Sequence, residues 1–311
     1  MKIITKRVLS LLTAFLFLML GTNVIAQRVN KLIELFENGE PGFGVLSFDY
    51  SLNNARSLAT SGLDFVFIDM EHAPFDVERL REFLLGMTNK RLILEKGNLQ
   101  PDVVPFVRIP AAGGAEELIS QAKQVLDVGV FGIFFPAVHT REQAELAVRA
   151  MRYPQYNGAS DFEPFGLRGR NPSNAAWYWG INDYHVKADV WPLDPEGELL
   201  AMMFIESAEG AENIEEIITV PGLGGIFIGP SDLSTSMGYA SPSAPQVEGA
   251  IQRVLQACLD HDVPCAITTS QNSVKERIEQ GFSFVTVGAD GGLNANAANA
   301  LQLGRETAGR E

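Results

Sequence analysis

Cysteine is scarce in this chain of 311 residues, which contains only Cys258 and Cys265. Two thiols are too few for a disulfide-bonded scaffold or for a zinc site built from cysteines. Positive charge is also in short supply, because 24 Lys and Arg residues oppose 38 Asp and Glu residues and leave a net charge of −14. A surface of that sign disfavours binding to nucleic acid or anionic lipid. Stability must come from packing, and the 46% apolar composition supports a sizeable core.

Several motifs of nucleotide-binding and covalent chemistry are absent as well. The sequence has no Gly-rich phosphate loop, no dinucleotide-binding fingerprint and no Gly-x-Ser-x-Gly elbow. An aldolase that works through a Schiff base needs a buried lysine at a strand end. The lysines after the N-terminal segment all fall on expected helices or loops, so imine catalysis is disfavoured.

The one long apolar run lies at the N-terminus. A basic start is followed by apolar residues from Val8 to Leu20 and then by small residues before Gln27, which is the pattern of a signal peptide over residues 1–26. The run is shorter than the roughly 20 residues of a spanning helix, which favours cleavage over an uncleaved anchor. We expect an exported, periplasmic protein with no membrane attachment after cleavage, or a cytoplasmic one if the leader does not function.

Short runs rich in Val, Ile and Phe recur through residues 27–311, which we interpret as a single domain. Because the runs are apolar on both faces, they are typical of parallel strands buried on both sides, and helical periodicity fills the segments between them. Eight such units predict a (β/α)8 TIM barrel, with a doubly wound open sheet as the alternative. The expected strands are residues 43–48, 65–70, 103–109, 132–138, 202–205, 225–229, 263–268 and 282–288.

Helices are expected before, between and after these strands. A helix over residues 28–38 would close the bottom of the barrel, and one over 293–305 would end the chain. Two connections, 87–102 and 152–200, are longer than a barrel requires; they suit lids, subunit contacts or plain structural insertions. The helices expected between the strands are residues 53–61, 77–87, 116–128, 141–152, 209–219, 245–260 and 272–280.

Polar residues end four of the expected strands, where a TIM barrel carries its active site. Each has a structural explanation: Asp69 can brace a loop, Arg108 can pair with a structural carboxylate, and His72 can be a satisfied core histidine. Ser207 and Asp232 can also be helix N-caps. A closed barrel points all four strand ends at one mouth, however, which favours a shared site. The residues are Asp69, Glu71 and His72 after the second strand, Arg108 at the third, Glu206 and Ser207 after the fifth, and Asp232 after the sixth.

The residue types predict the chemistry of this site. Glu206 and Asp232 end neighbouring strands with no Cys and no second His nearby, an all-oxygen set that favours Mg²⁺ or Mn²⁺ over Zn²⁺. Backbone amides at the Gly229-Pro230-Ser231 turn can hold a small carboxylate, and Arg108 is a second anchor for an anion. His72 can act as a base near neutral pH. Together they suit a small oxo acid and a metal-stabilised enolate.

Five sequence blocks resemble one known family in order along residues 38–298. They are Phe67-Ile68-Asp69-Met70-Glu71-His72-Ala73-Pro74; Val107-Arg108-Ile109-Pro110; Arg152-Tyr153-Pro154 with the later Gly166-Leu167-Arg168-Gly169; Phe204-Ile205-Glu206-Ser207; and Gly229-Pro230-Ser231-Asp232-Leu233-Ser234 with Met237-Gly238-Tyr239. The resemblance is to the HpcH/HpaI aldolases, the metal-dependent class II pyruvate aldolases of the citrate lyase-like superfamily. The Glu-His-Ala-Pro and Gly-Pro-Ser-Asp-Leu-Ser blocks are specific to it.

The resemblance implies a role for each matched residue. Glu206 and Asp232 would ligate a divalent metal, Mg²⁺ or Mn²⁺ with Co²⁺ as a further candidate, and Asp69 and Glu71 would hold metal-bound waters. Arg108 would neutralise the pyruvyl group, and the amides of Ser231 and Asp232, beside Gly229, would bind its carboxylate. His72 would be the base, oriented by Asp127. The family also implies cleavage of a 4-hydroxy-2-oxo acid to pyruvate, or a related 2-oxo acid, and an aldehyde, in a homohexamer or trimer of dimers whose partners exchange C-terminal helices.

The chain departs from the family pattern in three ways. It carries an export signal, residues 155–164 are inserted after the Arg-Tyr-Pro block, and Phe204 stands where relatives carry Gln. Phe204 would line the substrate pocket, so the aldehyde does not carry over from the family. Two alternative functions remain: a citrate-lyase-like or malyl-CoA-lyase-like enzyme, and an exported protein that binds an oxo acid without turnover. Retention of both His72 and Asp127 disfavours the second, since binding alone requires neither.

Overall fold

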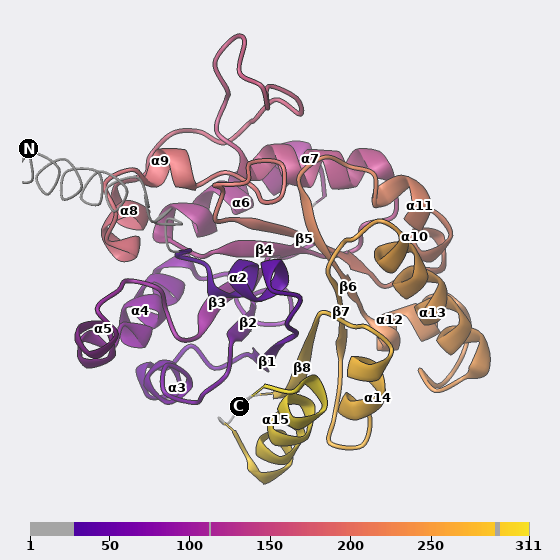
Figure 1. The fold of residues 1–311 in the computed structure, drawn as a ribbon. Coiled ribbons are helices and arrows are strands. Elements are labelled where there is room, and N and C mark those ends of the chain that lie inside the picture. Colours follow the sequence, from indigo (N-terminus) through magenta and orange to yellow (C-terminus); the bar gives the residue numbers. More distant parts are fainter. Residues whose placement is uncertain (1–27, 112, 290–292, 311) are drawn as a thin grey trace, which may run out of the picture.

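The computed structural model describes residues 28–111, 113–289 and 293–310, so the predicted signal peptide lies outside the described residues. Eight parallel strands pair in chain order and the last pairs with the first, which confirms the TIM barrel and excludes the open sheet (Figure 1). The strands are β1 (Gly42–Ser47), β2 (Phe65–Asp69), β3 (Val104–Arg108), β4 (Gly132–Phe135), β5 (Leu200–Ile205), β6 (Leu223–Ile228), β7 (Cys265–Thr268) and β8 (Phe284–Ala289).

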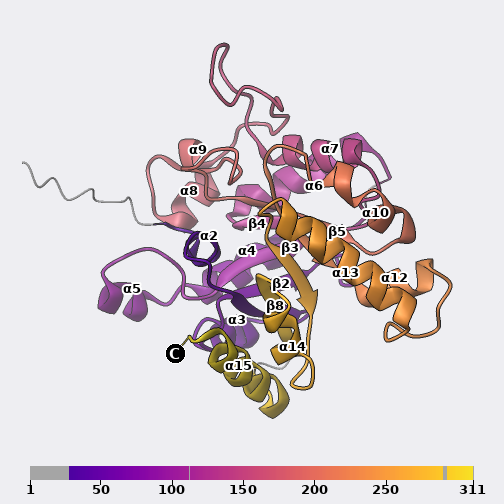
Figure 2. The same ribbon diagram turned by 45° about the vertical axis from the view of Figure 1, so that its right-hand side comes forward.

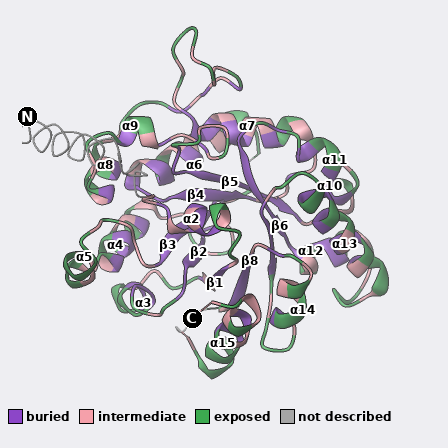
Figure 3. Ribbon diagram, in the orientation of Figure 1, coloured by how far each residue is buried: buried purple, intermediate pink, exposed green. Residues whose placement is uncertain are grey.

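Helices surround the barrel and turn their buried faces toward the strands (Figures 1 and 3). The predicted segment 209–219 forms two short helices rather than one. They are separated at Asn213, whose side-chain amide donates to the His139 carbonyl at 2.9 Å. The described helices are α2 (Lys31–Glu37), α3 (Leu52–Leu58), α4 (Val77–Met87), α5 (Lys90–Lys96), α6 (Ala115–Val128), α7 (Arg141–Met151), α8 (Ser173–Trp179), α9 (Tyr184–Lys187), α10 (Ala208–Glu212), α11 (Ile214–Ile217), α12 (Pro230–Ser236), α13 (Pro245–Asp260), α14 (Val274–Glu279) and α15 (Ala295–Ala308).

The barrel interior is filled by phenylalanine rings. Phe204 stacks on Phe227 with ring centroids 4.6 Å apart, and Phe67 stacks on Phe134 at 4.2 Å. Edge-to-face contacts join these two pairs to each other. Because these rings fill the space, the barrel is a packed core rather than a pore. A substrate can therefore enter only at an end of the barrel.

The two ends of the barrel differ. At the end where the strands begin, α2 lies across the opening, as predicted for the capping helix (Figure 1). The Asn30 side chain ties this helix to the carbonyl of Glu198, and Leu32 packs so closely on Gly42 that a β-carbon there would lie 2.4 Å from its methyl group. The opposite end, where the strands finish, is therefore the end open to a substrate.

Both long connections contain helices that the sequence pattern did not predict: α5 within residues 87–102, and α8 and α9 within 152–200. Between α7 and α8 the chain forms a loop that projects from the barrel in two views (Figures 1 and 2). This loop contains the inserted residues 155–164 and carries Tyr156, which is largely exposed. Arg152 anchors its base, because its buried guanidinium pairs with Asp161 and Asp189 at 2.7 Å each.

The C-terminal helix α15 packs on its own barrel. It contacts α14 and β8, and a β-carbon at Gly304 would lie 2.4 Å from the Phe43 ring. The exchange of this helix between subunits, which the resemblance implied, concerns an assembly and stays a prediction. Cys258 and Cys265 are buried free thiols. Across the described residues, none of the helices combines the length and apolar character needed to cross a bilayer.

Candidate active site

A layer of polar side chains lies directly above the phenylalanine core. Side chains two apart on a strand point to the same face. Asp69 therefore stands above Phe67, Arg108 follows Phe106, and Glu206 follows Phe204 at the ends of β2, β3 and β5. All three point into the barrel mouth. The predicted convergence of strand ends is thus a direct result of strand alternation and barrel closure.

Arg108 lies at the centre of this layer. Asp69 and Arg108 are partners in the register of β2 with β3, and the Arg108 guanidinium binds both carboxylate oxygens of Asp69, with Nε at 3.2 Å from Oδ1. Its Nη1 is 3.0 Å from Glu71 Oε2. Asp69 is fully buried and Arg108 nearly so. A charge in such a place requires an opposite charge, so the two residues hold each other in position.

Asp69 also shapes the loop that follows β2. Its Oδ1 accepts the backbone N–H groups of Glu71 at 2.9 Å and His72 at 3.2 Å. The Tyr50 hydroxyl donates to the backbone carbonyl of Asp69 from the segment after β1. The loop-bracing explanation for Asp69 is therefore correct. It is also compatible with a role in the site, because the braced loop carries His72.

His72 is not a core histidine, since 59% of its side chain is exposed. Its Nδ1 lies 2.8 Å from Arg108 Nη2 and 3.5 Å from Asp69 Oδ2. A guanidinium can only donate hydrogen bonds, so Nδ1 accepts here and the neutral ring carries its proton on Nε2. Arg108 thus occupies one lone pair of the imidazole in this arrangement.

The carboxylates of Glu206 and Asp232 repel each other across neighbouring strand ends. Burial raises the pKa of the Glu206 carboxyl; the Ala137 amide and Arg108 oppose this, and the charge of Asp232 adds to it. Burial likewise raises the pKa of the Glu71 carboxyl. The positive charge of Arg108 opposes this rise, and the negative charge of Glu206 adds to it. Asp232 itself is exposed in the first turn of α12. A cation placed among these carboxylates would reduce the repulsion between their charges.

The start of α12 fits a small anion. Gly229 is the N-cap residue and no side chain caps the helix, while Pro230 has no N–H. The amides of Ser231 and Asp232 are therefore the first donors of this helix. Gly229 also leaves necessary space, because a β-carbon there would lie 3.1 Å from both Glu206 Oε2 and the Phe204 ring. Asp232 is not the N-cap, whereas Ser207 caps α10 by accepting the Gly210 amide at 3.0 Å.

The donor set suits a divalent metal with water ligands. Among the residues that the structure describes, no group of three or more His, Cys, Asp or Glu side chains forms a ready cluster of ligands. Two carboxylates, Glu206 and Asp232, with the remaining positions left to water and substrate, match the way Mg²⁺ is bound in proteins. The charge of Asp232, which helps to raise the pKa of the Glu206 carboxyl, agrees with that fit.

Phe204 points into the barrel, as strand alternation requires, but it is only 4% exposed. Its ring lies beneath Arg108, whose guanidinium carbon is 5.2 Å from the ring centroid. Phe67 supports the same guanidinium from 5.4 Å. Phe204 therefore forms the floor beneath Arg108 and also lies beside Gly229.

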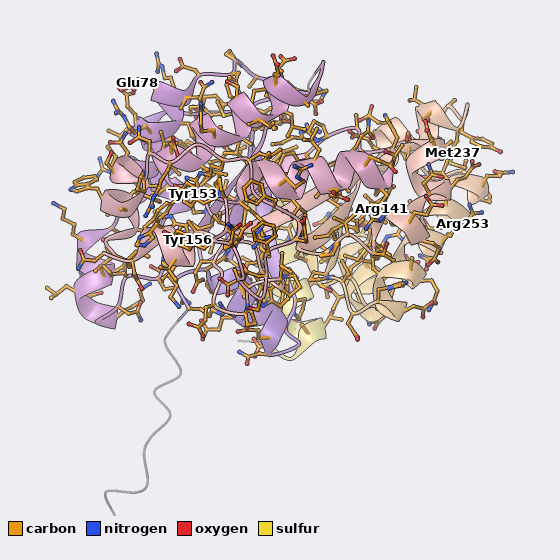
Figure 4. The ribbon with its side chains drawn as sticks, turned by 90° about the horizontal axis from the view of Figure 1, so that it is seen from above. Glu78, Arg141, Tyr153, Tyr156, Met237 and Arg253 are labelled. Carbon is orange, nitrogen blue, oxygen red and sulfur yellow. The ribbon has the colours of Figure 1, made fainter. Side chains whose placement is uncertain are left out.

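Asp127 is not brought to His72 within this chain. It lies in the last turn of α6, which leads into the beginning of β4, whereas His72 follows the end of β2. Its partner is Arg168, at 3.0 Å, whose fully buried guanidinium also bonds the Tyr184 hydroxyl and lies 4.4 Å from the centre of the Tyr153 ring. Asp69 and Glu71, rather than Asp127, are the carboxylates near the His72 ring. Figure 4 shows Tyr153, together with Tyr156, on the segment that follows α7.

One contributor to the site had no sequence signal. Ala137, two residues beyond β4, donates its backbone N–H to Glu206 Oε1 at 2.8 Å. Strand four was expected to continue to residue 138, yet it ends at Phe135. Pro136 supplies no amide for the ladder, and Ala137 has a left-handed backbone with φ of 52°. Alanine is not a residue that predicts this conformation.

Comparison with known proteins identifies the family of this chain. The family profile of HpcH/HpaI aldolase/citrate lyase matches residues 50–297. A 4-hydroxy-2-oxo-heptane-1,7-dioate aldolase of Shigella boydii is 36% identical over 279 residues, which span 88% of this chain and 93% of that protein. A 5-keto-4-deoxy-D-glucarate aldolase of Escherichia coli is 32% identical over 247 residues, or 78% of this chain and 84% of that protein.

Solved structures give the same result. An HpcH/HpaI aldolase/citrate lyase family protein from Burkholderia cenocepacia superposes with a TM-score of 0.70 and 30% identity, covering 84% of this chain and 93% of that one. The fold and the similarity along most of the chain agree, and the enzyme class predicted from the sequence, aldehyde-lyase, is confirmed. The chain belongs to the HpcH/HpaI aldolase/citrate lyase family.

Proposed function

We propose that the protein cleaves a 4-hydroxy-2-oxo acid to pyruvate, or a related 2-oxo acid, and an aldehyde. The observation that carries the proposal is the meeting of Arg108, His72 and the Glu206 carboxylate at one barrel mouth. Two relatives at 36% and 32% identity are named as aldolases of hydroxy-oxo or keto-deoxy acids. An oxo acid requires an anion anchor and a base, and these residues supply both.

Glu206 and Asp232 would hold the divalent metal, Mg²⁺ or Mn²⁺ with Co²⁺ as a further candidate. When bound, such an ion polarises a carbonyl oxygen and stabilises the negative charge of an enolate. The amides of Ser231 and Asp232 would bind the substrate carboxylate, since no side chain caps that helix. Phe204 and Phe67 would keep water away from the underside of the anion site.

Arg108 and His72 would act in sequence. Arg108 donates to His72 Nδ1 in the structure, which keeps that lone pair occupied. When the pyruvyl oxygens take the donors of Arg108, Nδ1 becomes free to remove the proton of the 4-hydroxyl group. The C3–C4 bond then breaks, its electron pair enters the enolate of the 2-oxo acid, and the aldehyde departs. The protonated His72 ring then returns the proton to C3 of the enolate, directly or through water, which gives pyruvate, and Arg108 stabilises the negative charge until then.

The test is an assay of the metal-stripped protein with pyruvate, added Mg²⁺ or Mn²⁺, and a panel of polar and apolar aldehydes. We expect aldol product only with metal. Glu206→Ala and Asp232→Ala should lose both turnover and Mn²⁺ binding, whereas Glu209→Ala, an exposed carboxylate three residues from Glu206, should keep them. Full activity of metal-free Asp232→Ala would contradict the proposal. So would a pyruvyl-lysine adduct trapped with borohydride, because it would indicate imine chemistry.

We also propose that the protein is exported and forms homo-oligomers, as the leader and the family resemblance suggest. Expression of the full chain in a Gram-negative host should yield periplasmic protein whose sequence begins near Gln27. An intact N-terminus in the cytosol would refute export. Light scattering of the mature protein would distinguish a hexamer from smaller species.

A further inference from the structure

The loop between β4 and α7 contains an unusual backbone conformation. Ala137 has φ of 52°, and within the described ranges only Asp262, at 54°, is another non-glycine residue with positive φ. The left-handed region is disfavoured for residues with a β-carbon, and Asp tolerates it better than Ala because its side chain can bond locally. The structure around Ala137 must therefore hold it there. Such positions concentrate at functional sites.

The surroundings of Ala137 are tied to the segment that carries Glu206. The Val138 amide donates to the Phe204 carbonyl at 3.3 Å, just before Glu206. The His139 ring lies 2.7 Å from the Ser207 hydroxyl, just after it. The loop is thus fastened on both sides of Glu206, and the Ala137 amide bonds the carboxylate between these two points.

This bond distinguishes the two oxygens of Glu206. Oε1 accepts the Ala137 N–H at 2.8 Å, while Oε2 is the oxygen that faces Gly229, 3.1 Å from where a β-carbon would stand. Gly229 leads into the first turn of α12, which carries Asp232. Val138 and His139 hold the chain that follows residue 137. A change of φ at residue 137 to an extended or right-handed value would therefore rotate the peptide plane before it. That rotation would turn the N–H away from Oε1 and let the Glu206 carboxylate rotate.

We propose that Ala137 is a positioning residue of the metal site, whose strained backbone fixes Oε1 so that Oε2 is presented toward Asp232. The inference rests on the proposed function, in which Glu206 and Asp232 bind the metal. The loss of a group that orients a metal ligand in this way lowers metal affinity by roughly 10-fold to 100-fold.

The experiment measures Mn²⁺ affinity of the metal-stripped full-length protein by electron paramagnetic resonance of free Mn²⁺, with the melting temperature recorded in parallel. Ala137→Val should weaken Mn²⁺ binding by about 10-fold or more, because a β-branched residue resists the left-handed region. Ala137→Gly keeps the N–H and adopts positive φ freely, so its affinity should stay within about twofold of the parent. Asp262→Val, the matched control, should lower the melting temperature without changing the affinity.

A second variant removes only the hydrogen bond. Replacing Ala137 by lactic acid through nonsense suppression turns the amide into an ester, which has no N–H but the same methyl group. We expect a loss of Mn²⁺ affinity similar to that of Ala137→Val. An ester variant that binds Mn²⁺ as tightly as the parent would overturn the inference, whatever the valine variant does. If the parent itself binds no Mn²⁺, the proposed metal site fails instead, so the two failures are distinct.

Discussion

The buried pair of Asp69 and Arg108 allows a sharp test of how the site is held together. Asp69→Asn preserves the shape of the side chain and removes its charge. Asparagine can turn its oxygen toward the amides of Glu71 and His72, but its NH₂ group then faces the guanidinium, and both are donors. Arg108 would keep only Glu71 as a charged partner, at 3.0 Å.

The size of the stability loss in Asp69→Asn follows from the burial of the ion pair. Removing one member of a buried ion pair costs about 3–5 kcal/mol, and the remaining contact with Glu71 places this case near 3 kcal/mol. At about 2–4 °C per kcal/mol, the melting temperature should fall by roughly 6–12 °C. Because Arg108 would no longer be aimed at the substrate, kcat/KM should fall by about 10²-fold, the cost of a displacement on the order of 1 Å.

Asp64→Asn is the matched control. Asp64 is also fully buried, lies just before β2 at the opposite end of the barrel, and pairs with Arg310 at 2.8 Å. Loss of the Asp64 charge should lower the melting temperature by an amount similar to that in Asp69→Asn. It should leave kcat/KM per folded molecule unchanged. The measurements are calorimetry and steady-state kinetics on both variants. Equal kinetic losses in both, or a change of less than about 2 °C in Asp69→Asn, would refute the reasoning.

Three other predictions concern single residues. His72→Ala should lower kcat by roughly 10² to 10⁴ without changing Mn²⁺ affinity or the melting temperature, since the side chain is mostly exposed; a variant that melts early but turns over normally would indicate a structural histidine. Burial disfavours the charged form of Asp64, but Arg310 and Lys31 outweigh it and lower its pKa. Its contribution to stability is therefore present above about pH 4 and lost as the pH falls through the folded-state pKa, so melting temperatures of the parent and Asp64→Asn should converge at acid pH rather than stay parallel. Phe204→Gln should shift kcat/KM several-fold toward polar aldehydes, on the order of 1 kcal/mol for one neutral hydrogen bond, whereas an unchanged ratio would leave Phe204 as packing beneath Arg108.

The positions of the site residues along the chain were predictable because they depend on local periodicity. A run that is apolar on both faces predicts a parallel strand, and the residue that ends the run predicts the barrel mouth. Asp69, Arg108 and Glu206 could be placed on one polar layer in that way. Where the local pattern was ambiguous, the prediction was less accurate. The segment 209–219 looked like a single helix, and its division at Asn213 depends on a bond to a loop more than 70 residues away.

What the sequence by itself determined is the barrel, its open end and the residue types at that end, since strand alternation and closure follow from patterns within a few residues. Only the tertiary structure decided which residues contact one another at and around the site. Asp127 pairs with Arg168 and not with His72, because α6 returns to the end where the strands begin. Ala137 reaches Glu206 because two neighbouring strands end at the same height, although 69 positions separate them in the chain. Such contacts depend on strand register and backbone conformation, and an alanine in the sequence predicts neither of them.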